Sequence, residues 1–138
     1  RIPTEGSVFV SVKDSDKDKI LNPVSDLFSL GFDIYATDGT AEFLNNNNIQ
    51  TKKINKVLQG SPHIVEMISE KKISLVLNTT ETPQAIKDSK SIRRSALESE
   101  TPYYTTVSGA NAVVMAIKAI KNNEISIKTI QSFGQLLS

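Results

Sequence analysis

The sequence has 138 residues, and its 16 lysines and arginines nearly balance 15 aspartates and glutamates, which leaves a net charge of +1. This length is typical of one globular domain, and the balanced charge gives no overall attraction to nucleic acid or to an anionic membrane. The absence of cysteine excludes disulfides and thiolate nucleophiles, and a single histidine disfavours a zinc site. Apolar runs are far shorter than the roughly 20 residues of a membrane-spanning helix, so we expect a cytoplasmic location.

The first part of the sequence alternates strand-length apolar runs with helical patterns. Residues 7–12 include three β-branched valines and predict a strand, and apolar residues at helical spacing over 20–28 predict a helix that Gly31 ends. Residues 32–36 predict a second strand, and residues 41–46 predict a short second helix.

The middle of the sequence repeats this alternation. Residues 51–54 predict a third, weaker strand. Ser61 and Pro62 predict the start of a third helix, with Ser61 as the N-cap and Pro62 at the first helical position. Residues 73–77 predict a fourth strand.

The last part begins with a helical pattern over residues 84–98, followed by a fifth strand at 102–106 and an almost wholly apolar helix at 110–120. The apolar contacts expected on the first of these helices are Ala85, Ile86, Ile92, Ala96 and Leu97. The tail, residues 123–138, is expected to add a short strand and a helix on the outside of the sheet. Because parallel strands need crossovers of helix length, the whole pattern predicts an α/β layer structure with a mainly parallel, five-stranded sheet.

Polar and small residues follow every predicted strand, and in such folds these segments share the edge of the sheet where ligands bind. They are Lys13 to Lys17, Thr37 to Thr40, Asn55 and Lys56, Asn78 to Thr80, and Thr105, Thr106, Ser108 and Gly109. This set offers hydroxyls, amides and lysines but hardly a general base. Such residues at helix starts are typical of a site for a phosphate group.

Each of these segments also has a purely structural explanation. Lys17 lies in the first turn of a predicted helix, where the macrodipole disfavours a cation unless an anion is bound there. Acidic neighbours at positions 14, 16 and 18 could instead neutralise it while the side chain points to solvent. The segment from Thr37 to Thr40 could be an ordinary strand-to-helix turn, in which a threonine caps and Gly39 is left-handed.

Catalytic signals are weak. His63 has no nucleophile in a recognisable elbow, so we expect a structural role for it. Arg93 and Arg94 fall within a helix, where at most one faces the site. Asp88 either accepts a hydrogen bond from a sugar or pairs with a neighbouring basic side chain. The sequence contains no Walker loop and no dinucleotide fingerprint.

Several segments together resemble one family, the C-terminal allosteric domain of the large subunit of carbamoyl phosphate synthetase. They read SVKDSDKDK, GFDIYATDGTAEFL, INKVLQGSPHI, LVLNTTETPQAIKDSKSIRRSAL and YYTTVSGANAVVMAI. The resemblance runs in order through every predicted strand end. It implies a Rossmann-like three-layer sandwich similar to methylglyoxal synthase, with residues 7–138 as the allosteric domain and residues 1–6 as a linker from a preceding synthetase domain. The start on Arg1 instead of methionine also favours a fragment of a longer protein.

The resemblance implies that this domain binds a nucleotide effector. In the family, UMP inhibits and IMP activates bacterial enzymes, whereas UTP or phosphoribosyl pyrophosphate acts on the animal pyrimidine enzymes. The implied contacts are Lys17, Thr37, Gly39, Thr40, Lys56, Asn78 and Thr80, with Ser11 and Asp88 as secondary contacts. Tyr103, Tyr104 and Thr105 resemble an interdomain stretch that helps to bind ornithine in bacterial relatives, although Tyr104 stands where those relatives often carry an acidic residue.

The parent enzyme of this family makes carbamoyl phosphate from bicarbonate, ATP and glutamine-derived ammonia for pyrimidine and arginine synthesis. The resemblance therefore implies ATP, Mg or Mn, and K in the parent, a small glutaminase subunit and other synthetase domains as partners, and neither catalysis nor a cofactor in this domain.

Two alternatives remain. A free-standing lyase of the methylglyoxal synthase type needs a catalytic aspartate and paired histidines, whereas this chain has Asn78 to Glu81 after the fourth strand and only His63. The other alternative is a non-regulatory module for oligomerisation of the large subunit.

Overall fold

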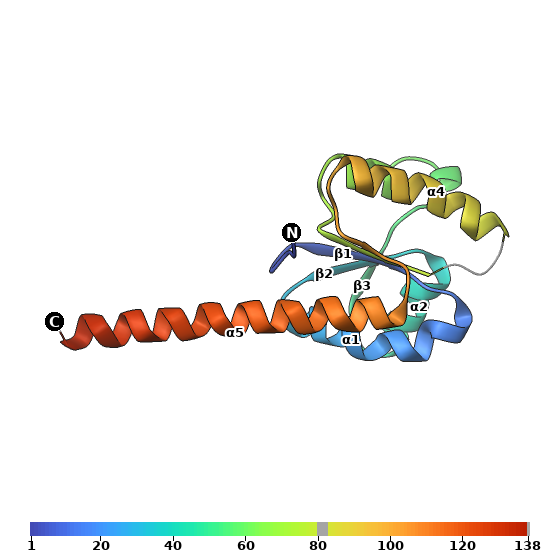
Figure 1. Ribbon diagram of the computed structural model, residues 1–138. Helices are drawn as coiled ribbons and strands as arrows, with labels where there is room; N and C mark the ends of the chain where they lie inside the picture. Colours follow the sequence, from blue (N-terminus) through green and yellow to red (C-terminus); the bar gives the residue numbers. More distant parts are fainter. Residues whose placement is uncertain (80–82, 138) are drawn as a thin grey trace.

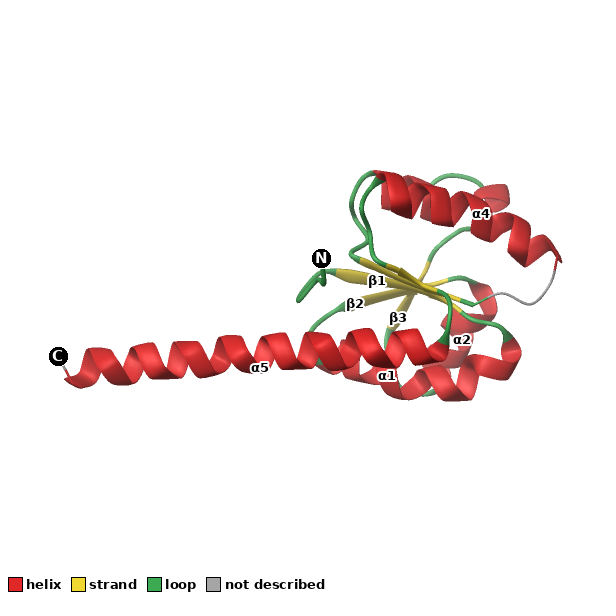
Figure 2. Ribbon diagram, in the orientation of Figure 1, coloured by secondary structure: helices red, strands yellow, loops and turns green. Residues whose placement is uncertain are grey.

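The computed structural model describes residues 1–79 and 83–137. A five-stranded sheet lies between two layers of helices, with α3 and α4 on one face and α1, α2 and α5 on the other (Figures 1 and 2). The predicted α/β architecture with a parallel, five-stranded sheet is confirmed. The division into a linker at residues 1–6 and a domain at 7–138 stays a prediction.

All neighbouring strands pair in parallel, in the order β3-β2-β1-β4-β5. The strands are β1 (Ser7–Ser11), β2 (Asp33–Ala36), β3 (Thr51–Lys53), β4 (Leu75–Asn78) and β5 (Tyr103–Tyr104). The chain builds outward from β1 to β3 and then crosses to β4 on the other side of β1. The order therefore reverses between β1 and β4, and the carboxyl ends of these two strands flank the crevice in which open α/β sheets bind ligands.

The helices are α1 (Lys17–Ser29), α2 (Asp38–Asn46), α3 (Ile64–Ser69), α4 (Pro83–Glu98) and α5 (Val107–Leu137). Two single turns of 3-10 helix, Asp14–Asp16 and Val57–Gln59, precede α1 and α3. Gly31 ends the α1 region with a φ of 98°, a left-handed conformation that favours glycine, as predicted.

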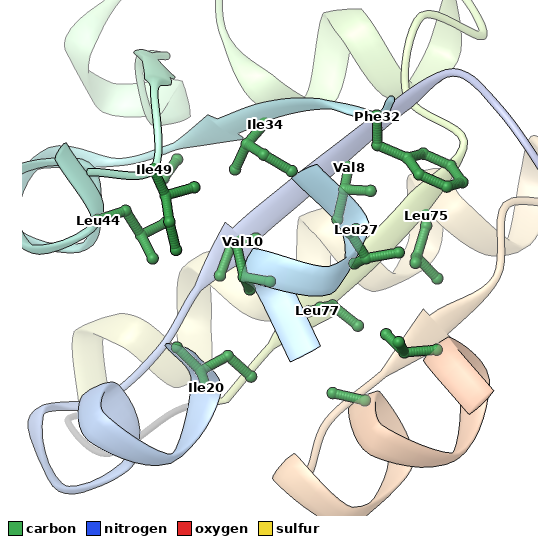
Figure 3. Packing of buried hydrophobic residues seen from close by; sticks show 14 of the residues in the cluster. Val8, Val10, Ile20, Leu27, Phe32, Ile34, Leu44, Ile49, Leu75 and Leu77 are labelled. Carbon is green, nitrogen blue, oxygen red and sulfur yellow. The ribbon is translucent and has the colours of Figure 1, made fainter. Parts of the chain in front are cut away.

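The two faces of the sheet bury separate apolar clusters because successive strand residues point to opposite faces. Val8 and Val10 of β1 pack with α1, α2 and α5, in the cluster shown in Figure 3. Phe9, between them, packs on the other face with residues of α3 and α4 such as Ile64 and Ile92.

Helix α2 begins earlier than the predicted residue 41. Thr37 has the extended backbone of an N-cap residue, but its side chain makes no capping hydrogen bond. Gly39 lies inside the first turn and is not among the residues with positive φ in the described chain. The explanation of this segment as a threonine-capped turn with a left-handed glycine is therefore wrong.

Helix α3 begins later than predicted, and its N-cap is His63, not Ser61. His63 Nδ1 accepts from the Glu66 N–H at 3.3 Å, and the His63 N–H donates to Glu66 Oε1 at 3.0 Å. A parallel bridge to Asn55 keeps His63 extended, so the helix can start only after it. The structural role expected for His63 is confirmed.

Replacing His63 by alanine is expected to lower the free energy of unfolding by about 1 kcal/mol, because the Glu66 N–H loses its acceptor. His63→Ser removes similar bulk but restores an oxygen acceptor, so it should recover much of the loss. Urea unfolding of the three proteins measures the difference. Equal stability of the alanine and serine variants would contradict a capping role.

Helix α4 buries Ile92 and Ala96 as predicted, whereas Ile86 and Leu97 are exposed. The side chain of Ala85 lies outside the described residues.

Helix α5 runs without a break to Leu137, so the short strand predicted in the tail is wrong. Residues 110–133 contain no glycine or proline, and nothing interrupts the helix there. Lys118 and Lys121 anchor α5 to α1 through Asp26 and the Leu30 carbonyl, at 2.7 and 2.9 Å. Beyond them the helix projects past the sheet, as Figure 1 shows, and Ile125, Ile127 and Ile130 are exposed.

Candidate functional site

The loops after β1, β2 and β4 are held together by threonine hydroxyls at the point where the strand order reverses. Thr79 Oγ1 accepts from the Lys13 N–H at 2.9 Å, and Thr40 Oγ1 accepts from the Val12 N–H at 3.3 Å. In each pair the backbone donates, so the hydroxyl hydrogen remains for another acceptor. The hydroxyls thus fix the loops and keep a donor for a ligand.

A third contact ties β1 to β2, since Ser11 Oγ and Thr37 Oγ1 lie 3.3 Å apart. This contact explains why Thr37 does not cap α2. Thr37, Thr40, Asn78 and Thr79 are all buried, and they account for most of the buried polar residues in the described part of the chain. Polar groups are costly to bury, so their concentration at one edge makes that edge the candidate site.

An open pocket of about 260 Å³ lies over these loops, and we call it the rim pocket. Its lining is Ser11, Val12, Lys13, Asp14, Lys17, Thr37, Asp38, Gly39, Thr40, Lys56 and Thr79. The structure therefore brings together Ser11, Lys17, Thr37, Gly39, Thr40 and Lys56, as the sequence predicted.

The start of α2 faces the rim pocket without a cap. The first backbone hydrogen bond of this helix runs from the Ala41 N–H to the Thr37 carbonyl, so the preceding N–H groups, of Asp38, Gly39 and Thr40, have no acceptor within the helix. Free N–H groups at a helix N-terminus carry partial positive charge and bind anions.

Lys17 is directed into the rim pocket and is not free in solvent. Its side chain is only 20% exposed, and its Nζ binds the Asp14 carboxylate. A Cβ placed on Gly39 would lie 3.7 Å from Lys17 Nζ, so the ammonium group sits beside the uncapped helix start. The hydrogen bond from Lys17 lowers the pKa of Asp14, which keeps this carboxylate ionised. An incoming anion must compete with Asp14 for the ammonium group.

Asp38 lies at the outer edge of the rim pocket and is held by two donors. Lys53 Nζ lies 2.9 Å from Oδ1, and Gln59 Nε2 donates to Oδ2 at 2.9 Å. The hydrogen bond from Lys53, followed by that from Gln59, lowers the pKa of Asp38. These contacts turn the Asp38 charge toward β3 and its following turn.

Because the pKa of Asp38 is lower in the fold than the ordinary value of 3.8, Asp38 stabilises the fold above that pH, and the contribution disappears as pH falls through the folded pKa. Asp38→Asn is therefore expected to be less stable than the wild type at pH 7, and by a smaller margin at about pH 3, because the contribution of Asp38 declines as pH falls below the ordinary value of 3.8. Urea unfolding at both pH values tests this, with Glu42→Gln on the exposed face of α2 as control. A stability difference of the same size at both pH values would contradict the assignment.

A smaller inner pocket of about 40 Å³ continues from the rim pocket toward α4. It shares Ser11, Thr37, Lys56 and Thr79 with the rim pocket and adds Phe9, Val57, Ile64, Asn78, Asp88, Ser89 and Ile92. Asn78 and Asp88 thus lie beside the predicted phosphate contacts, on the α4 side. Thr80, also predicted here, lies outside the described residues.

The three residues predicted on the interdomain side do not lie together. Tyr103 and Thr105 line a third cavity of about 260 Å³, which we call the side pocket. Its remaining lining is Asn78, Ile86, Ser89, Lys90 and Arg93. Tyr104 instead packs against the cluster on the opposite face of the sheet, because adjacent strand residues alternate.

A family model described as the MGS-like domain matches residues 19–105, more than half of the chain. The chain belongs to the MGS-like domain family. It is 46% identical over 132 residues to the carbamoyl phosphate synthase large chain of Brucella suis, which covers 96% of this chain and 11% of that protein. The same large chain of Methanobrevibacter smithii is 46% identical over 129 residues, covering 94% of this chain and 12% of the relative. The chain therefore spans only about a ninth of these relatives.

The fold of this MGS-like domain is also found in a solved structure. A crystal structure of methylglyoxal synthase from Elizabethkingia anophelis NUHP1 has a TM-score of 0.65 and 18% sequence identity, and the match covers 82% of this chain and 79% of that one. The predicted family and the predicted methylglyoxal synthase-like fold are confirmed.

Some lining residues of this MGS-like domain are not among the contacts that the resemblance implies. Lys13 and Thr79 follow strands, as the selected residues do, but nothing in the sequence showed that they bond to each other across β1 and β4. Ser89 was missed because its role depends on accepting from Asn78 Nδ2, at 2.9 Å.

Two further properties concern the described part of the MGS-like domain. Its His, Asp and Glu side chains form no group of three or more that could hold a metal ion. Among its helices, none combines the length and the apolar character needed to cross a membrane.

Proposed function

We propose that this MGS-like domain is the nucleotide-binding regulatory domain of a carbamoyl phosphate synthase large chain. The observation that carries the proposal is the rim pocket, where lysines, buried threonine hydroxyls and an uncapped helix start converge. The 46% identity to large chains of this enzyme supports the parent protein.

The rim pocket has the donors that a phosphate group needs. The free N–H groups at the start of α2 supply hydrogen bonds, and the hydroxyls of Thr40 and Thr79 supply more, since both accept from backbone N–H groups. Lys17 and Lys56 supply charge. Gly39 has no side chain, which allows an anion to approach the backbone closely.

At about 40 Å³ the inner pocket is too small for a whole nucleoside, so the nucleoside part of the same effector would reach into it only in part. Phe9, Ile64 and Ile92 give it apolar walls, and Asp88 and Asn78 provide an acceptor and an amide for sugar or base groups. The proposed contacts are therefore Lys17, Thr37, Gly39, Thr40, Lys56 and Asn78, with Ser11 and Asp88 as secondary contacts. Thr80 is retained from the resemblance alone.

The effector would regulate the parent enzyme if it binds more tightly to one arrangement of this domain and its partner domains than to another. An effector shifts an equilibrium only by the difference between its affinities for the two arrangements. Inhibition by UMP and activation by IMP would each reflect such a difference. The partners we propose are the synthetase domains of the large chain and, through them, the small glutaminase subunit. ATP, Mg or Mn, and K belong to the cytoplasmic parent enzyme and not to this domain.

The test is calorimetric titration of the chain with UMP and with IMP, beside Thr40→Ala. We expect at least one nucleotide to bind and Thr40→Ala to weaken it about tenfold, because one hydrogen bond to a charged group is lost. Thr129→Ala, on the exposed end of α5, is the matched control and should change nothing. If neither nucleotide binds, the proposed effectors are wrong, and the alternative oligomerisation module is favoured.

A further inference from the structure

The rim pocket has two ends, and only one of them adjoins the inner pocket. The shared end is lined by Ser11, Thr37, Lys56 and Thr79, which belong to both pockets. The other end, which we call the outer end, is lined by Val12, Lys13, Asp14, Lys17, Asp38, Gly39 and Thr40. A nucleotide whose nucleoside part lies toward the inner pocket places its first phosphate group beside Lys17 and Gly39. Any further phosphate group must therefore extend into the outer end.

The charged side chains of the outer end balance each other before any ligand binds. Lys13 and Lys17 are its cations, and Asp14 and Asp38 are its anions. Asp38 is held by Lys53 and Gln59, which lie outside the rim pocket. Asp14, in contrast, depends on a lysine of the pocket itself. The outer end therefore has little positive charge to offer beyond the first phosphate group.

Asp14 is the carboxylate that a bound phosphate group would leave uncompensated. Among the ion pairs in the described part of the chain, Asp14 takes part only in the one with Lys17. The hydrogen bond from Lys17 lowers the pKa of Asp14, and even at the ordinary value of 3.8 this carboxyl group is ionised at neutral pH. A phosphate group that binds Lys17 competes for the same ammonium group, so the negative charge of Asp14 is then no longer balanced.

We propose that Asp14 is a specificity-determining residue, which limits the rim pocket to nucleotides with one phosphate group. The inference rests on the proposed function, because it concerns the same effector site. One phosphate group carries a charge of roughly −1.5 to −2 at pH 7, which Lys17, Lys56 and the start of α2 can balance. The second and third phosphate groups of a nucleoside triphosphate would extend toward Asp14, where like charges repel.

The chain offers a matched pair of aspartates for the test. Asp14 and Asp18 lie four residues apart, and both are exposed. Asp14 lines the rim pocket, whereas Asp18, in the first turn of α1, does not. Asp14→Asn and Asp18→Asn therefore make the same change of charge in the same segment. Only the first removes a carboxylate from the outer end of the pocket.

The experiment is calorimetric titration of the whole chain and both variants with UMP and UTP, and with IMP and ITP. The buffer has low ionic strength and contains EDTA, so that no divalent cation neutralises the additional phosphate groups. We expect the wild type to bind the monophosphate at least about tenfold more tightly than the triphosphate. Asp14→Asn should lower this ratio about tenfold, chiefly by tightening triphosphate binding, whereas Asp18→Asn should leave the ratio unchanged. Circular dichroism checks that both variants are folded.

The outcomes distinguish this inference from the proposed function. If the wild type binds a monophosphate no more tightly than its triphosphate, or if Asp14→Asn leaves the ratio unchanged, the role of Asp14 is overturned while the nucleotide site remains supported. A ratio that both variants lower equally would also overturn it, because overall charge would then explain the effect. If neither monophosphate binds to the wild type, the proposed function is contradicted, and the inference about Asp14 fails as well.

Discussion

Phe9→Ala is expected to lower the free energy of unfolding by about 3–5 kcal/mol. Phe9 is fully buried at the centre of β1, the middle strand of the sheet, and packs with Ile54, Ile68 and Val76 under α3 and α4. Alanine would leave a cavity there that strands on both sides prevent from closing. Urea unfolding of the wild type and the variant measures the loss.

Phe28→Ala is the matched control, because Phe28 on α1 is 38% exposed and is not part of either buried cluster. It should lose about 1 kcal/mol or less. Equal losses for the two phenylalanines would contradict the two-cluster core. Because Phe9 also lines the inner pocket, its variant should bind nucleotide more weakly even under conditions in which it remains folded.

Lys17→Ala is expected to weaken binding of a nucleoside monophosphate by about 10- to 100-fold, the loss of a charge-assisted hydrogen bond. Lys17 is the ammonium group beside the uncapped start of α2. Its removal also leaves the Asp14 carboxylate without its partner at the same pocket, where it would repel the phosphate. Calorimetric titration at low salt measures the change.

Lys19→Ala provides the control, since Lys19 is an exposed lysine on the same helix and does not line the rim pocket. Any effect of overall charge would appear in both variants, whereas a local contact affects Lys17 alone. Equal affinities for the two variants would contradict the position of the phosphate beside Lys17.

The strands and the side of the sheet that binds ligands could be predicted because they depend on local apolar patterns. Strands such as β1 and β4 are apolar runs of the right length, and the segments after them must meet at one edge of a parallel sheet. For this reason the sequence predicts that Lys17, Thr37 and Lys56, which are far apart in the chain, lie together, and all three line the rim pocket.

Helix starts were less predictable because capping depends on contacts between distant segments. Thr37 looks like an N-cap residue, but its hydroxyl is close to Ser11 on the neighbouring strand instead. His63 is an unusual cap, and its extended backbone is fixed by pairing with Asn55. Neither contact leaves a signal in the local sequence.

The strand predicted near the end of the chain is wrong for a different reason. Ile125 and Ile127 alternate with polar residues, a pattern typical of a strand. A strand also needs a neighbour to pair with, whereas α5 continues because it satisfies its own backbone hydrogen bonds. The local sequence also does not show that Arg93 and Arg94 line different pockets, since this depends on how α4 is rotated over the sheet.

The most direct test of the central claim, that the rim pocket binds the phosphate of a nucleotide, is calorimetric titration of the chain with UMP and with uridine under the same low-salt conditions. The two ligands differ only in the phosphate group. We predict that UMP binds and that uridine binds at least about tenfold more weakly, because the phosphate makes the charge-assisted contacts. Equal affinity for UMP and uridine, or no binding of UMP, would contradict the claim.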